Sequence, residues 1–123
     1  MPGGDGGRGG NNMSRHHWKN REREAAAMVA GRRYPANMGG PIDVEGPVFV
    51  AQVKERKRLS LLEIETLALE IERQGQLKTK AGIVMVKRSG GRGTETPWLI
   101  CMTAATFRLI NGPLPTDPAP EAS

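Results

Sequence analysis

The chain predicts a single α/β domain in which helices flank a mixed central sheet. Its 123 residues are the size of one domain. Apolar runs rich in β-branched residues alternate with segments of helical periodicity, and this alternation is typical of a sheet covered by helices. We expect the domain to cover residues 18–110. Residues 1–17, rich in glycine and asparagine, and residues 111–123, rich in proline, are expected to be disordered tails.

Three segments are predicted to be helical. The segment from Trp18 to Ala30 has an alanine-rich centre, which favours a helix. The segment from Ser60 to about Gln74 opens with Ser-Leu-Leu-Glu, which fits a capping box. Ala104 to Leu109 is a short helix that follows a threonine suited to the N-cap position.

Four segments are predicted to be strands. Ile42 to Val44 and Val48 to Val53 form a hairpin of β-branched and apolar residues around the turn signal Glu45-Gly46-Pro47. Ala81 to Val86 and Trp98 to Met102 are two further buried strands. The expected order is therefore helix, strand, strand, helix, strand, strand and short helix.

A polar pair stands at the end of the second hairpin strand. Successive strand side chains point to opposite faces, so Gln52 and Lys54 share a face and Val53 points the other way. Burying such a pair without partners is costly, so we expect this strand end to open onto a site. The turn brings Asp43 back near that face. An acid, an amide oxygen and a lysine can together bind a hard divalent cation and place an ammonium beside an activated water.

A carboxylate on the first helix is a further candidate for this site. At about 100° per residue, Glu22 falls on the apolar stripe formed by Trp18, Ala25 and Val29. One interpretation is a carboxylate that reaches solvent or pairs with a nearby arginine, and the other is a carboxylate aimed into the site. Glu24 is the competing candidate, although it points off the stripe.

These features resemble the PD-(D/E)XK nuclease superfamily, in which an acid on one strand and acid-x-Lys on the next bind magnesium and cut phosphodiester bonds. The stretches WKNRERE and GRRYP resemble the opening of the phage-type Holliday junction resolvases of that superfamily. The resemblance covers Trp18 to Leu109 and implies a restriction-endonuclease-like core of αββαββα order. The chain departs from the pattern at Gln52, where the family most often has glutamate and some branches have glutamine.

The resemblance also implies the members of the site and its chemistry. The catalytic residues would be Glu22, Asp43, Gln52 and Lys54, and the metal would be Mg²⁺, with Mn²⁺ as an alternative. Asp43, Gln52, Glu22 and the carbonyl of Val53 would hold it. The implied reaction is hydrolysis of branched DNA during recombination, leaving a 5′ phosphate and a 3′ hydroxyl. A homodimer suits that substrate, because branched DNA presents two equivalent strands.

Basic residues surround the proposed site. The formal net charge is +5 and the pI is about 9.9, which permits a polyanionic partner such as DNA. Arg32 and Arg33, in the turn after the first helix, are candidate phosphate contacts and equally a solvated turn. Arg56, Lys57 and Arg58 directly follow the proposed site, and this position favours a phosphate-tracking role over a merely solvated charge run.

Two leucines of the second helix lie away from its main apolar face. Leu62 and Leu69, seven residues apart, are bordered by polar residues. Such a pair is usually a satellite of the core, but it is also what a helical dimer contact requires. We predict that they belong to a homodimer contact.

Composition excludes several classes of protein. Cys101 is the only cysteine, so a disulfide framework and a cysteine zinc cluster are excluded. No apolar run approaches the roughly 18 residues of a membrane span, and the N-terminus lacks the apolar region of a signal peptide. We therefore expect a cytoplasmic protein, located in the host cytoplasm if it is viral.

Three alternatives to a junction resolvase stay open. The first is a nuclease of the same fold with another DNA target, since substrate choice depends on loops and dimer geometry. The second is a non-catalytic DNA-binding module that has lost an acid, for which Gln52 is the argument. The third is a basic structural or interaction protein, in which Asp43, Gln52 and Lys54 would not converge.

Overall fold

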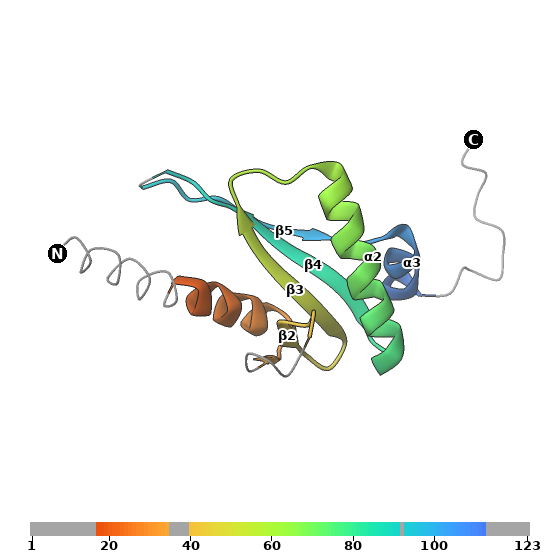
Figure 1. Ribbon diagram of the computed structural model, residues 1–123. Helices are drawn as coiled ribbons and strands as arrows, with labels where there is room; N and C mark the ends of the chain where they lie inside the picture. Colours follow the sequence, from red (N-terminus) through yellow and green to blue (C-terminus); the bar gives the residue numbers. More distant parts are fainter. Residues whose placement is uncertain (1–16, 35–39, 92, 113–123) are drawn as a thin grey trace, which may run out of the picture.

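The computed structural model describes residues 17–34, 40–91 and 93–112. Within them, a five-stranded sheet in the order β1-β2-β3-β4-β5 is flanked by helices (Figure 1). Strands β3 and β4 are parallel, and the other neighbouring pairs are antiparallel. The predicted α/β class with a mixed sheet is confirmed.

The helices and strands follow the predicted order, with one addition. The first helix, called the N-terminal helix below, spans residues 17–28. It is followed by β1 (Arg32–Arg33), β2 (Val44–Glu45), β3 (Phe49–Arg56), α2 (Leu61–Lys78), β4 (Ala81–Arg88), β5 (Trp98–Cys101) and α3 (Ala104–Asn111). The two-residue strand β1 was not predicted, because an arginine pair carries no strand signal and β1 forms only by pairing with β2.

Some predicted boundaries were wrong. Residues 17 and 111 were assigned to the tails, but both are helical, and the rest of each predicted tail lies outside the described residues, apart from residue 112. Strand β3 continues past its predicted end to Arg56, because it pairs with β4 along its full length. The first arginine of the predicted basic run therefore belongs to the sheet.

Two apolar clusters occupy the two faces of the sheet. The N-terminal helix covers one face, and its cluster comprises Ala25, Ala26, Val29, Val44, Ala51, Val53, Ile83 and Met85. Helix α2 covers the other face, and its cluster comprises Ile42, Val50, Ala68, Ile71, Val84 and Val86. Because residues 51 and 53 face the N-terminal helix, residues 50, 52 and 54 face α2. The two polar residues of the candidate site thus lie on the α2 face.

Helix α2 is fixed at its start and along its length. The predicted capping box is present: the Glu63 N–H donates to Ser60 Oγ (3.1 Å), and the Ser60 N–H donates to Glu63 Oε1 (2.9 Å). Farther along, a Cβ on Gly82 of β4 would lie 2.0 Å from the Ile71 carbonyl oxygen. Glycine at this position lets α2 lie directly on the backbone of β4, which passes behind α2 in Figure 1.

Within the described ranges, no helix combines the length and the apolar character that crossing a bilayer requires.

Candidate active site

Asp43 lies immediately before β2, where the pairing of β2 with β3 ends. Its backbone N–H donates to the Ala51 carbonyl (2.9 Å), and its side-chain Oδ2 accepts the Val53 N–H (2.8 Å). The carboxylate therefore replaces the backbone acceptor that a longer β2 would supply. The N–H and C=O of one residue point to the same side of a strand, so the Val53 carbonyl also faces the Asp43 edge.

The environment of Asp43 is unfavourable for its negative charge. Its pKa is raised above the ordinary value of 3.8, first because the carboxyl is partly buried and also because Glu22 is a nearby negative charge. The hydrogen bond from Val53 and the positive charge of Lys54 act in the opposite direction. Asp43 is thus a carboxylate in electrostatic contact with Glu22 and Lys54, and a bound cation would compensate its charge.

Glu22 is the N-terminal helix carboxylate that approaches this edge. It is buried, and its Oε1 accepts a hydrogen bond from Arg33 Nε (2.9 Å). Glu24, by contrast, is exposed, pairs with Arg21 (3.0 Å) and accepts the Trp98 Nε1–H (3.1 Å). The preference for Glu22 over Glu24 agrees with this geometry. Glu22 therefore pairs with an arginine and at the same time acts on Asp43.

Gln52 is buried on the α2 face, with 4% of its surface exposed. Its Nε2 donates to Glu70 Oε1 of α2 (3.0 Å). Its Oε1 is buried and has no hydrogen-bond partner among the described residues. A buried acceptor without a partner is costly, and a cation at this position would remove that cost.

Lys54 follows Gln52 on the same face, as predicted. It lines a groove with Arg56 and with residues of the first turns of α2, including Leu62 and Thr66. The lysine is half-buried, which is a suitable setting for an ammonium that acts beside the candidate metal ligands.

The available oxygens fit a hard divalent cation. Asp43 has a second carboxylate oxygen and the Val53 carbonyl faces the same edge, Glu22 acts electrostatically on Asp43 from the N-terminal helix, and Gln52 Oε1 is unpartnered on the α2 face. Oxygen donors of this kind are the ligands that Mg²⁺ prefers. No group of three or more His, Cys, Asp or Glu side chains able to hold a metal is found in the described ranges. The candidate set instead depends on an amide and a backbone oxygen.

The predicted phosphate contacts differ in their exposure to solvent and in whether an acidic residue already pairs with them. Arg33 is half-buried and engaged by Glu22, whereas Arg32 is exposed. Arg56, Lys57 and Arg58 are exposed at the carboxyl end of β3.

Two residues of this region were not predicted from the sequence: the cation Arg88, and Glu70, which contacts Gln52 in the site. Arg88 lies opposite Arg56 in the parallel β3–β4 pairing, and no local pattern connects either residue with the site.

Neutralising Arg56, Lys57 and Arg58 together is expected to weaken binding to DNA of any sequence. Each lost phosphate contact should reduce the slope of log affinity against log salt by roughly 1. Fluorescence anisotropy with a labelled duplex at several salt concentrations measures this slope. An unchanged slope would mean that the three residues form only a solvated surface.

Comparisons of the chain with protein-family models, with curated proteins and with solved structures found no match.

Proposed function

We propose that the protein is a metal-dependent DNA endonuclease similar to the Holliday junction resolvases of the PD-(D/E)XK superfamily. The observation that supports this most directly is the arrangement on β3 and on the segment just before β2. There, Asp43 interacts with Glu22 and Lys54, and the buried Gln52 Oε1 has no partner among the described residues. These are the acid, amide, lysine and helix carboxylate that the resemblance assigns to the reaction.

Each residue has a distinct role in this proposal. Asp43, Gln52, Glu22 and the Val53 carbonyl would hold Mg²⁺, for which Mn²⁺ can substitute. When bound, the metal would lower the pKa of a water molecule and neutralise charge on the scissile phosphate. Lys54 would orient the attacking water and stabilise charge that develops on the phosphate. Arg33 fixes the Glu22 carboxylate through its hydrogen bond.

A cleavage panel tests the proposal. Four-way junction, fork, duplex and single-stranded DNA are each incubated with the full-length protein and Mg²⁺, Mn²⁺ or a chelator. We expect metal-dependent cutting, strongest on the four-way junction, with 5′ phosphate and 3′ hydroxyl ends. Cutting of another substrate in preference would indicate a nuclease of the same fold with a different target.

A non-catalytic DNA-binding module is the second candidate. The observation in its favour is Gln52, because the site has one negative charge fewer than the usual pattern of the superfamily. Binding of the panel without cutting in either metal would support this candidate and would contradict the nuclease proposal.

The dimer prediction concerns Leu62 and Leu69 of α2, which are 69% and 50% exposed and therefore lie outside the core. Replacing both with Glu is expected to give a folded monomer, because the buried face of α2 is untouched. Binding to a four-way junction should weaken more than binding to duplex, since only the junction engages both subunits. Sedimentation and circular dichroism measure association and folding.

The matched control is Leu77→Glu, which alters another exposed leucine of α2 (76% exposed) and should leave association unchanged. A double variant that stays dimeric would place the interface elsewhere, and one that unfolds would place these leucines in a structural role.

A further inference from the structure

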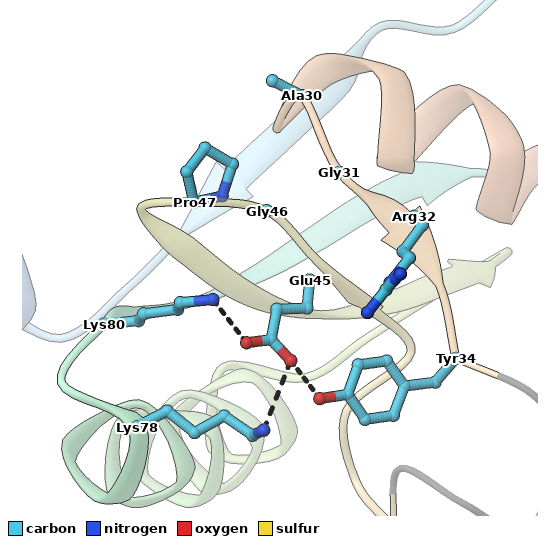
Figure 2. Close-up of a pocket in the computed structure, with 9 residues that line it drawn as sticks. All are labelled: Ala30, Gly31, Arg32, Tyr34, Glu45, Gly46, Pro47, Lys78 and Lys80. Atoms are coloured by element: carbon cyan, nitrogen blue, oxygen red, sulfur yellow. Dashed lines mark hydrogen bonds and ion pairs between the residues drawn. The ribbon is translucent and has the colours of Figure 1, made fainter.

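A polar hollow lies on the α2 face, at the opposite end of α2 from the groove beside Lys54. It has a volume of about 540 Å³, and its lining includes Arg32, Tyr34, Glu45, Lys78 and Lys80. Figure 2 shows the Glu45 carboxylate within it, with Lys78, Lys80 and Tyr34 pointing toward that carboxylate. These residues come from β1 and the position after it, from β2, from the end of α2 and from the turn between α2 and β4.

The hollow carries more positive than negative charge. The Glu45 carboxylate lies 2.5 Å from Lys80 Nζ and 3.3 Å from Lys78 Nζ, and it accepts the Tyr34 hydroxyl. The carboxylate is thus paired with two ammonium groups at once. Arg32 adds a third cation against this one anion. The lining therefore has a surplus of positive charge that faces open space.

The floor of the hollow is fixed by close backbone contacts. A Cβ on Gly31 would lie 2.0 Å from the Glu45 carbonyl oxygen, and a Cβ on Gly46 would lie 2.0 Å from the Val29 carbonyl oxygen. Glycine at both positions lets β2 pack against the chain that leaves the N-terminal helix. The cations are thus carried on a preformed surface, which reduces the entropic cost of binding a ligand.

The hollow is aligned with the candidate active site along α2. Glu70 contacts Gln52 of the site, and Lys78 contacts Glu45 of the hollow. These eight residues of helix correspond to a rise of about 12 Å. Arg56 lies at the other end of this face, beside the start of α2. The candidate site therefore lies between two basic regions on one face.

We propose that this hollow binds a phosphate group of the DNA backbone, on the strand that enters the candidate site. The separation of about 12 Å corresponds to roughly three to four nucleotides of a strand that rises 3.4 Å per nucleotide. Arg32, Lys78 and Lys80 would contact the phosphate, and Glu45 would hold both lysines in place while opposing the incoming anion. The inference rests on the proposed function for the identity of the anion.

Two substitutions with opposite expected signs test the proposal. Arg32→Gln removes the cation that lies beside the Glu45 network and leaves that network intact. Glu45→Gln removes the opposing negative charge and keeps only one of the two acceptor oxygens, so it also frees one of the two lysines from Glu45. Duplex binding is measured in chelator, so that no cutting occurs, across a series of salt concentrations. Lys19→Gln, which neutralises an exposed lysine of the N-terminal helix, is the matched control for net charge.

We expect Arg32→Gln to bind duplex about fivefold more weakly at 0.15 M salt, with a slope lower by about 1. Glu45→Gln should bind more tightly than the unmodified protein, and Lys19→Gln should be unchanged. Circular dichroism confirms that each variant is folded. Equal affinities for all four proteins, or weaker binding by Glu45→Gln, would overturn the proposal and indicate a purely structural ion network.

Inorganic phosphate distinguishes the source of the anion. If only free phosphate occupies the hollow, phosphate will raise the melting temperature of the unmodified protein more than that of Arg32→Gln, while duplex binding is the same for both. That result would also overturn the proposal. Binding is measured without cutting, so the failures of the two proposals can be distinguished. If the variants change the salt slope as expected but the protein never cuts DNA, only the nuclease proposal is contradicted. If the protein cuts DNA but the variants leave the salt slope unchanged, only the phosphate-binding role of the hollow is contradicted.

Discussion

Lys54→Ala is expected to reduce DNA cleavage by on the order of 10²-fold or more while the fold and most DNA binding remain. Lys54 is half-buried on the same face as Gln52, and its positive charge acts on Asp43. Its removal should take away stabilisation of charge that develops on the phosphate during the reaction. Single-turnover cleavage with saturating protein measures the chemical step, and anisotropy in chelator measures binding.

Lys57→Ala is the matched control for this variant. Lys57 is an exposed lysine just beyond the end of β3, so its loss should weaken binding slightly and leave the saturated cleavage rate unchanged. A Lys54→Ala protein that cuts at a rate near that of the unmodified protein would remove Lys54 from the reaction.

Asp43→Asn is expected to reduce cleavage by on the order of 10²- to 10³-fold, without loss of stability. The asparagine oxygen can still accept the Val53 N–H, so the β2–β3 edge is preserved. Burial and Glu22 raise the pKa of Asp43 in the fold, so the negative charge at this position opposes folding. The variant lacks this unfavourable charge and should melt at the same temperature as the unmodified protein or higher.

The pH dependence of stability follows from the sign of that shift. A carboxyl with a raised pKa in the fold contributes stability below its unfolded pKa, near 3.8, and loses that contribution as pH rises through the raised value. The advantage of Asp43→Asn should therefore be absent in acid and appear as pH rises above the raised pKa. Thermal melts across this range measure it.

Asp43→Ala is the structural comparison for the same position. It removes the acceptor of the Val53 N–H as well as the charge, so it should be less stable than Asp43→Asn. An asparagine variant that loses stability and still cuts DNA would show that Asp43 has only a structural role.

Much of the fold was predictable because its signals are local. The Gly46-Pro47 turn, the Ser60 capping box and the apolar strands each act within a few residues, and their order defined the α/β class. Strand β1 was not predictable, since an arginine pair becomes a strand only when β2 lies beside it. The extent of β3 depends in the same way on its pairing with β4.

The candidate site was likewise predictable only where its signals are local. The shared face of Gln52 and Lys54 follows from the period of a strand, and the inward position of Glu22 follows from the period of a helix. The bond between Gln52 and Glu70, and the meeting of Glu45 with Lys80, join residues that are far apart in sequence. Such contacts depend on how α2 lies on the sheet, which no local pattern specifies.

The pairing of β2 with β3, which the Asp43 carboxylate extends, is short, and this affects how easily the chain opens locally. Gln52 and Lys54 belong to a strand paired over eight residues with β4, whereas β2 itself contributes only two residues to its pairing with β3. Local unfolding requires less free energy where fewer contacts are lost. Opening of the β1–β2 edge would therefore require less free energy than separation of β3 from β4, and it would carry Asp43 away from Lys54. A ligand that bridges Asp43 and Gln52 would close this edge, so binding and local folding would be coupled.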